Sequence, residues 1–251
     1  MAKKQNKKQD RQSARSQRQQ QKNQRDAQMQ KITTYTGIAV VVLVVAFIGI
    51  YVFSNNQGGS AGGGNVPLSI EGQPTLGPSD APVDVIEFGD FKCPACKAFH
   101  EQVFPQLQEN YIDTGQVEFA FLNFPLPLGQ DSWTAADGAE CVYQQVGNEA
   151  FWDYYDAVYA NQGPESQTWA TPELLVQLAQ DYTDAEIDAD GLRQCINDQQ
   201  YRDEVERDRN MGLTASIPGT PAIFVNGRQM SDFRYATIAS AIDEELNSGA
   251  E

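Results

Sequence analysis

The sequence predicts an α/β fold that contains an all-helical insertion and is preceded by a single transmembrane helix. Three observations lead to this prediction. Two runs with the composition of buried strands, 82–90 and 116–124, enclose a helical pattern. Apolar residues at helical spacing fill 131–214, and a strand and a helix follow at 221–246. A run of 22 residues without charge, 32–53, comes before all of these elements.

Residues 1–31 form a basic, glutamine-rich tail. They contain ten Lys or Arg, two Asp and ten Gln, and almost nothing apolar, so they cannot bury enough surface to fold and are predicted to be disordered. Their net charge of +8 leaves −24 for residues 32–251. No nucleic-acid partner is expected, because glutamine dilutes the positive charge and no aromatic residue is interleaved with it.

Residues 32–53, "ITTYTGIAVVVLVVAFIGIYVF", are predicted to cross a membrane. At ~1.5 Å per residue they can span a hydrocarbon core of roughly 30 Å. The basic tail is expected to be cytoplasmic by the positive-inside rule, which places the chain beyond 53 on the outer side of the cell membrane. Two alternatives are less favoured: a buried core helix lacks globular sequence before it, and a cleaved signal peptide would have a shorter basic region.

The stretch "SNNQGGSAGGGN" predicts a flexible extracytoplasmic linker over 54–76, with a short strand at 68–71. Residues 77–130 and 215–251 are expected to form one α/β domain around a helical insertion at 131–214. The chain beyond the predicted membrane helix is strongly acidic and has only two lysines, so its surface is expected to repel nucleic acid and anionic lipid.

The first part of the α/β domain is predicted to be a strand, a helix and a second strand. A helix begins near Pro94, which suits a first turn because its missing N–H would have no partner there. A right-handed crossover then places the strand at 116–124 parallel to the strand at 82–90. The buried face of the helix is expected to carry Cys96, Phe99, Val103 and Leu107.

The last part of the domain is predicted from "PAIFVNGRQM" (221–230), a strand that ends in an Asn-Gly hairpin turn, and from an amphipathic helix at 235–246. The insertion before it contains an aromatic cluster. Its helical spacing predicts core packing, with Trp152 or Tyr155 beside a substrate groove. The cluster consists of Phe151, Trp152, Tyr154, Tyr155 and Tyr159.

Cys93 and Cys96 form a Cys-X-X-Cys motif at the start of the predicted helix. Unpaired N–H groups and the helix dipole favour a thiolate at Cys93, while the more enclosed Cys96 can attack a mixed disulfide at Cys93. This arrangement predicts redox exchange. Two other interpretations stay open: a zinc or copper site, which lacks further ligands because His100 is the only histidine, and a structural disulfide, which would close a very short loop.

Cys141 and Cys195 lie in the predicted insertion, 54 positions apart. All four cysteines follow the predicted membrane helix, where disulfides form and persist. If these two pair, loop-closure entropy contributes about 4 kcal/mol of stability, and they are assigned as a structural disulfide. The alternative is a redox relay from Cys96, which requires Cα separations below ~7 Å.

Three motifs occur in order along the chain: "APVDVIEFGDFKCPAC" (81–96), "AADGAECVYQQVGNEAFWDYYDAVYANQ" (135–162) and "IPGTPAIFVNG" (217–227). Together they resemble the DsbA family of thiol-disulfide oxidoreductases, in particular its membrane-anchored, BdbD-like members, over 77–246. The resemblance implies a thioredoxin fold with an inserted helical domain and the oxidation of dithiols in exported proteins. Several anchored relatives look similar in having a second cysteine pair.

The resemblance also implies roles for individual residues. Thr220-Pro221 matches the family's cis-proline, whose backbone can pair with a substrate strand; the alternative is a simple turn before the strand. Glu87 matches the family's buried acid, which would exchange a proton with Cys96; the alternative is a solvent-facing residue at a sheet edge. His100 is expected to be a surface or cap residue.

Pro94 and Ala95, between the two cysteines, are expected to contact substrate. They differ from the Pro-His of the best-known oxidase of the family. The imidazole would stabilise the thiolate, so its loss leaves open how strongly oxidising the pair is.

The sequence therefore predicts a membrane-anchored dithiol-disulfide oxidoreductase in which Cys93 is the nucleophile and Cys96 the resolving thiol. Its expected partners are reduced exported proteins and, by resemblance, a quinone-linked membrane reoxidant of the DsbB or vitamin K epoxide reductase type. No cofactor and no metal are expected, and the protein is expected to be a monomer. The alternatives are a disulfide isomerase or reductase, a thiol-based copper or zinc carrier and a redox-inert scaffold.

Overall fold

The structure, a computed structural model, describes residues 67–248. The predicted basic tail (1–31), the predicted transmembrane helix (32–53) and most of the predicted linker (54–76) lie outside the described residues. Within 67–248, no helix has the length and apolar character needed to span a bilayer.

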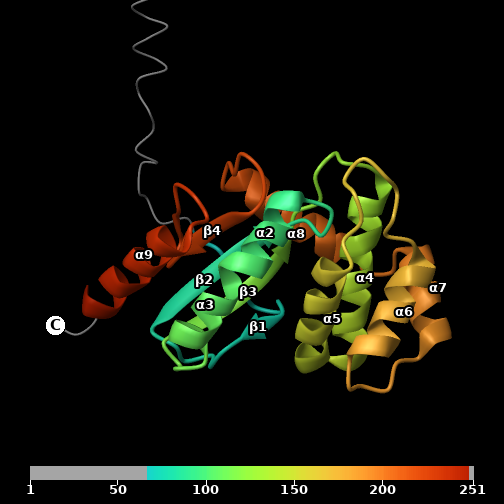
Figure 1. The fold of residues 1–251 in the computed structure, drawn as a ribbon, viewed down its shortest axis with the longest axis horizontal. Helices are drawn as coiled ribbons and strands as arrows, with labels where there is room; N and C mark the ends of the chain where they lie inside the picture. The colour runs from blue at the N-terminus through green and yellow to red at the C-terminus, as the bar shows by residue number, and fades with distance from the viewer. Residues whose placement is uncertain (1–66, 249–251) are drawn as a thin grey trace, which may run out of the picture. The chain divides into compact units, whose positions relative to one another are not determined.

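A five-stranded sheet forms the centre of the described chain, in the order β1-β3-β2-β4-β5 (Figure 1). The central strands β2 and β3 pair in parallel, as the crossover rule predicts, and β4 pairs antiparallel with β2 on its other side. The strands are β1 (Thr75–Leu76), β2 (Val83–Gly89), β3 (Val117–Asn123), β4 (Ala222–Val225) and β5 (Arg228–Gln229).

The predicted strand at 68–71 is wrong. The edge strand of the sheet is instead β1, in which Thr75 pairs with Ala120 of β3, so the end of the predicted linker belongs to the folded domain. Side chains of the insertion hold it there: Asn148 bonds both the N–H and the carbonyl of Thr75, at 2.8 and 2.6 Å, and the indole N–H of Trp152 donates to the same carbonyl at 2.8 Å. These contacts join residues that are far apart in the sequence, so the local sequence pattern does not predict them.

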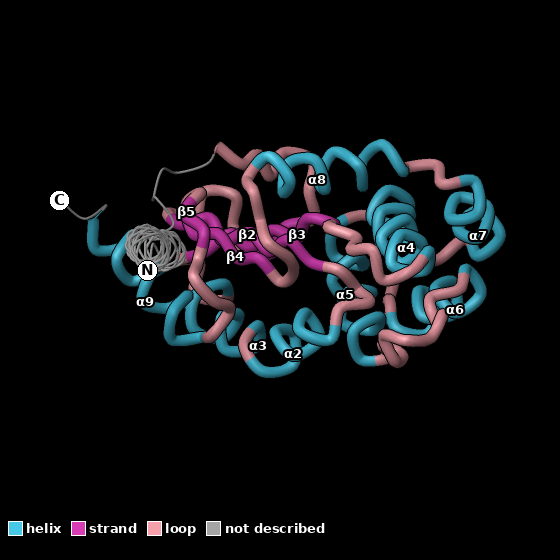
Figure 2. The backbone as a smooth tube through the Cα atoms, turned by 90° about the horizontal axis from the view of Figure 1, so that it is seen from above, coloured by secondary structure: helices cyan, strands magenta, loops and turns pink. Residues whose placement is uncertain are grey.

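Helices cover both faces of the sheet, as the view in Figure 2 shows, with α8 (Arg202–Thr214) on one side and α2, α3 and α9 on the other. Because side chains alternate along a strand, Ile86 and Phe88 face α8, whereas Val85 and Glu87 face the opposite layer. The helices of that opposite layer are α2 (Pro94–Gln102), α3 (Phe104–Leu107), which continues into a π-helical turn (Gln108–Ile112), and α9 (Tyr235–Ser248).

The helical insertion lies between β3 and β4 in the sequence; its last helix, α8, lies on one face of the sheet, and its other helices pack beside the sheet (Figure 1 and Figure 2). The predicted α/β fold with a helical insertion is thereby confirmed. Gly147, at φ +85°, makes the sharp turn between the first two helices, which L side chains rarely allow. The helices are α4 (Gln130–Val146), α5 (Asn148–Ala160), α6 (Pro172–Tyr182), α7 (Ala189–Asp198) and α8 (Arg202–Thr214).

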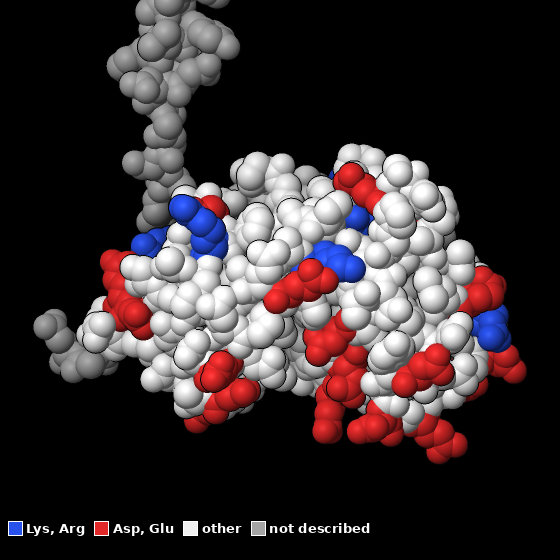
Figure 3. Space-filling model, viewed as in Figure 1, with Lys and Arg blue, Asp and Glu red and all other residues white. Residues whose placement is uncertain are grey.

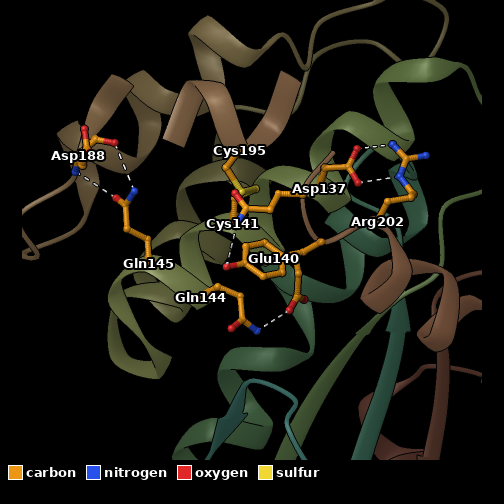
Figure 4. The surroundings of a disulfide bond; sticks show 10 residues. Asp137, Glu140, Cys141, Gln144, Gln145, Asp188, Cys195 and Arg202 are labelled. Carbon is orange, nitrogen blue, oxygen red and sulfur yellow. Dashed lines mark hydrogen bonds and ion pairs between the residues drawn. A yellow bond between two sulfur atoms is a disulfide. The ribbon is translucent and has the colours of Figure 1, made fainter. Parts of the chain in front are cut away.

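A disulfide between Cys141 of α4 and Cys195 of α7 crosslinks the insertion, with a Cα–Cα distance of 6.1 Å (Figure 4). Polar contacts on either side join the same layers. The guanidinium of Arg202, at the start of α8, forms an ion pair with the buried carboxylate of Asp137 on α4. Helix α4 is therefore tied covalently to α7 and by charge to α8.

Among the charged side chains on the face shown in Figure 3, acidic ones are more widespread than basic ones. We expect this charge to make the domain more stable in salt, because mutual repulsion between like charges is screened. Raising KCl from about 0.05 M to about 1 M should increase the free energy of unfolding by at least about 1 kcal/mol, measured by urea denaturation. Sucrose, which strengthens burial without screening charge, is the control. An unchanged or lower stability in KCl would contradict the expectation.

Candidate active site

Cys93 and Cys96 lie where β2 gives way to α2, on the face of the sheet that also carries Glu87. Cys93 is the residue that caps the N-terminus of α2, and Cys96 lies within its first turn. Both are free thiols. Cys93 keeps 7% of its surface accessible, beside the exposed ring of Pro94, whereas Cys96 is completely buried. The sulfur of Cys93 can therefore contact another polypeptide, whereas the sulfur of Cys96 cannot.

The surroundings of the two thiols separate their proton affinities. A hydrogen bond from Cys96, with further help from Thr220 and from the backbone N–H groups of Ala95 and Cys96, lowers the pKa of Cys93 to about 6 despite its burial. Burial raises the pKa of Cys96 well above its ordinary value, and the negative charge on Cys93 adds to this effect. At neutral pH, the reduced pair holds one thiolate, on Cys93, and one thiol, on Cys96.

Alkylation of the reduced protein tests this assignment. Because thiolates react and thiols do not, the rate at which iodoacetamide modifies Cys93 should rise with pH through a midpoint of about 6. Mass spectrometry should find the label on Cys93 and not on the buried Cys96. A midpoint at the ordinary value for a thiol, ~8.5, would contradict the assignment.

The Thr220-Pro221 segment lies against the reactive sulfur. Its peptide bond is cis, as the family resemblance implies. The thiol of Cys93 is 3.5 Å from the carbonyl oxygen of Thr220. A polypeptide bonded to Cys93 would therefore pass beside the backbone of Thr220.

Glu87 lies in the middle of β2, the central strand, with no solvent exposure, so the alternative of a solvent-facing edge residue is excluded. Its neighbours across the sheet are the apolar Phe121 and Ile223. Burial raises the pKa of Glu87 to about 8; a hydrogen bond from Tyr155 opposes this rise, and the charge of Cys93 adds to it. A carboxyl group that titrates so close to neutral pH can both give and accept a proton.

The insertion contacts the active-site loop at three points that sequence patterns alone do not reveal. The side-chain amide of Gln162, just beyond α5, donates to the carbonyls of Phe91 (2.7 Å) and Cys93 (3.1 Å). The ammonium group of Lys92 forms a buried 2.6 Å ion pair with Asp131 at the start of α4. The third contact is the 2.6 Å hydrogen bond from the Ser132 hydroxyl to Asp90.

His100 and Tyr155 depart from expectation. His100 is 14% exposed and not a free surface residue: it stacks on Tyr159, with ring centroids 5.2 Å apart, and its Nε2 lies 2.8 Å from an Asp156 carboxylate oxygen. Tyr155 does not border a groove, because it is completely buried with its hydroxyl directed at Glu87. The cluster does form part of the core, as predicted.

A protein-family model described as Thioredoxin matches residues 69–244. The chain belongs to the thioredoxin family. It is also similar to curated relatives from Bacillus. It is 34% identical over 212 residues to the probable disulfide bond formation protein D of Bacillus anthracis, covering 84% of this chain and 94% of that one. It is 38% identical over 179 residues to disulfide bond formation protein D of Bacillus subtilis (strain 168), covering 71% and 79%.

Solved structures show the same relationship. The crystal structure of oxidised BdbD from Bacillus subtilis matches with a TM-score of 0.68 and 38% identity, over 71% of this chain and 95% of that one. DsbA from Chlamydia trachomatis matches with a TM-score of 0.67 and 27% identity, over 75% and 98%. The resemblance to the DsbA family is confirmed, and this member of the thioredoxin family is a dithiol-disulfide oxidoreductase.

Proposed function

We propose that the protein introduces disulfide bonds into exported proteins, from a single-pass anchor in the cell membrane with its catalytic domain on the outer side. The unequal cysteine pair carries this proposal: a partly accessible thiolate at Cys93 and a buried thiol at Cys96. The relatives named disulfide bond formation protein D support the client class. The uncharged run at 32–53 behind a basic tail supports the anchor.

In the first step, a client thiolate attacks Cys93 Sγ of the oxidised pair. The Cys93–Cys96 bond breaks, a client–Cys93 disulfide forms, and Cys96 leaves with the electron pair as a thiolate. Protonated Glu87 then gives its proton to this buried thiolate, whose pKa lies far above that of the carboxyl. The backbone of Thr220 binds the client segment, and Pro94 and Ala95 contact it beside the sulfur.

In the second step, another thiolate of the client attacks the client sulfur of the mixed disulfide. Cys93 leaves as a thiolate, which its low pKa makes a good leaving group. The client has lost two electrons and two protons, and the enzyme pair has gained the two electrons. A quinone-linked membrane protein of the DsbB or vitamin K epoxide reductase type would remove these electrons, and a shared membrane keeps the two proteins together.

The reduction potential of the Cys93–Cys96 pair distinguishes an oxidase from a reductase. Equilibration with glutathione, read by mass spectrometry, should give a value well above the ~−270 mV of thioredoxin and toward the ~−120 mV of DsbA, because the Cys93 thiolate stabilises the reduced form. A value at or below that of thioredoxin would reject the oxidase and support a reductase. Stoichiometric zinc or copper held by the reduced pair would support the metal-carrier alternative.

The client class is tested by trapping. In cells that produce the full chain with Cys96→Ser, the mixed disulfide at Cys93 cannot be resolved by the enzyme, so client proteins should remain attached and be released by reductant. We expect exported, cysteine-containing proteins among them. Recovery of cytoplasmic proteins alone would contradict the proposed location, and recovery of none would contradict the proposed activity.

A further inference from the structure

Two buried tyrosines of α5, one helical turn apart, differ in the hydrogen bonding of their hydroxyl groups. Tyr155 and Tyr159 both have no solvent exposure, and their rings touch, with centroids 4.9 Å apart. The hydroxyl of Tyr155 donates a 2.8 Å hydrogen bond to Oε2 of Glu87. The hydroxyl of Tyr159 has no partner among the described residues. The helix therefore presents one phenol that hydrogen-bonds to the carboxyl group of the active site and one that does not.

Glu87 depends on that contact. Its other oxygen, Oε1, has no hydrogen-bond partner within residues 67–248, so Tyr155 makes the one hydrogen bond to this carboxyl in the described chain. Gly89 leaves space for the group: a Cβ at Gly89 would lie 3.0 Å from Oε1 and 2.3 Å from a carbon of the Phe121 ring. A carboxyl in an apolar pocket with one donor takes its position from that donor.

We propose that Tyr155 is a positioning residue of the thiol-disulfide reaction: its hydroxyl holds the Glu87 carboxyl in place and controls how readily that carboxyl accepts the proton of Cys96. The inference deepens the proposed function and rests on its proton exchange between Glu87 and Cys96. It assigns to the helical insertion a part, through Glu87, in the chemistry of a dithiol that belongs to the other part of the fold.

The direction of the effect follows from the charges around Glu87. An O–H donor stabilises a carboxylate more than a carboxylic acid, so Tyr155 lowers the pKa of Glu87 against the opposing effect of burial. Burial and the neighbouring Glu87 raise the pKa of Tyr155 itself well above its ordinary value, so it remains a donor. The titratable groups that face Glu87 or its two tyrosine neighbours are Cys93, Cys96, Asp90, Tyr155, Tyr159, Asp156 and His100.

Loss of the Tyr155 hydroxyl should affect ring closure and ring opening unequally. Ring closure is the formation of the Cys93–Cys96 disulfide from a mixed disulfide at Cys93, and ring opening is its cleavage by an attacking thiolate. When Cys96 must lose its proton to attack a mixed disulfide at Cys93, the proton goes from Sγ to the Glu87 carboxylate, and fewer molecules have that carboxylate if its pKa rises. When Cys96 leaves as a thiolate, the proton comes from the Glu87 carboxylic acid, which already predominates at pH 7. Ring closure should therefore slow, while ring opening should not.

Glutathione disulfide is the probe for ring closure. The Cys93 thiolate of the reduced protein attacks it and releases one glutathione thiolate. Cys96 then closes the Cys93–Cys96 disulfide and releases the second. We expect Tyr155→Phe to slow this closure on the order of tenfold at pH 7, the effect of one hydrogen bond to a charged group, and to move the midpoint of its pH profile upward. Acid-quenched samples analysed by mass spectrometry give the rate.

Tyr159→Phe is the matched control, because it removes an equally buried hydroxyl of the same helix that makes no hydrogen bond to Glu87; closure should stay within about twofold. In a Glu87→Gln background, which slows closure itself, Tyr155→Phe should have no further effect. A carboxyl titration by ¹³C NMR of the oxidised protein provides a second readout: the pKa of Glu87 should rise in Tyr155→Phe and not in Tyr159→Phe.

The proposal is overturned if Tyr155→Phe leaves both the closure profile and the Glu87 titration unchanged, if Tyr159→Phe reproduces its effect, or if the effect persists without Glu87. If Glu87→Gln slows closure but Tyr155→Phe does not, the role of Glu87 stands and that of Tyr155 falls. Client trapping in cells does not depend on this result, so failure of the proposed function is recognised separately.

Discussion

Cys93→Ser is expected to reduce client oxidation to the rate of the uncatalysed reaction, because a serine hydroxyl does not ionise near neutral pH and cannot form a disulfide. Cys96→Ser should also lose turnover, but in a different way. Its Cys93 thiolate still attacks a disulfide probe once and then stays in the mixed disulfide, since no second sulfur can release it. Both variants therefore lose steady-state turnover, but only Cys96→Ser accumulates a mixed disulfide at Cys93.

The measurement is a turnover assay with reduced, unfolded ribonuclease as the client, followed by mass analysis after incubation with glutathione disulfide. Cys96→Ser should gain one glutathione on Cys93, and Cys93→Ser should gain none, because the buried Cys96 is both inaccessible and protonated. Residual turnover by Cys93→Ser, or efficient labelling of its Cys96, would contradict the assignment of Cys93 as the nucleophile. In that case clients and glutathione would not react at Cys93, although 7% of its surface is accessible.

The central elements of the fold could be predicted from sequence because each follows from local chemistry. The apolar, β-branched run that becomes β2 has the length of one buried strand, and Pro94 fits a first helical turn. Asn226 and Gly227, both at positive φ, form the turn between β4 and β5. In contrast, β1 is two residues long and owes its place to Asn148 and Trp152, which lie more than 70 positions away.

The same distinction applies to the active site. The Cys-X-X-Cys spacing and the start of α2 predict a pair with unequal pKa values, and both features lie within four residues of the chain. The residues that complete the site come from the insertion. Tyr155 is 68 positions from Glu87, and Gln162 is 69 positions from Cys93. Helical spacing predicts that the aromatic face of α5 is buried, but it cannot predict which hydroxyl meets the carboxyl.

Replacing Cys141 and Cys195 together with alanine is expected to lower the free energy of unfolding by about 4 kcal/mol, since the disulfide closes a loop with a separation of 54 residues. This is a large fraction of the 5–15 kcal/mol that is typical of a folded domain. Alanine is preferred to serine because both positions are buried and a hydroxyl would lack partners. Urea denaturation with Cys93 and Cys96 kept reduced gives the difference.

The active site should survive this loss in the folded variant. The disulfide joins α4 to α7, whereas the groups that lower the pKa of Cys93 belong to Cys96, Thr220 and Ala95, at the start of α2 and just before β4. The alkylation midpoint of Cys93 should therefore stay at about 6 while stability falls. A stability loss below about 1 kcal/mol would show that the unfolded chain is already restricted without the crosslink. A shifted midpoint would instead mean that the crosslink also holds the groups that stabilise the thiolate.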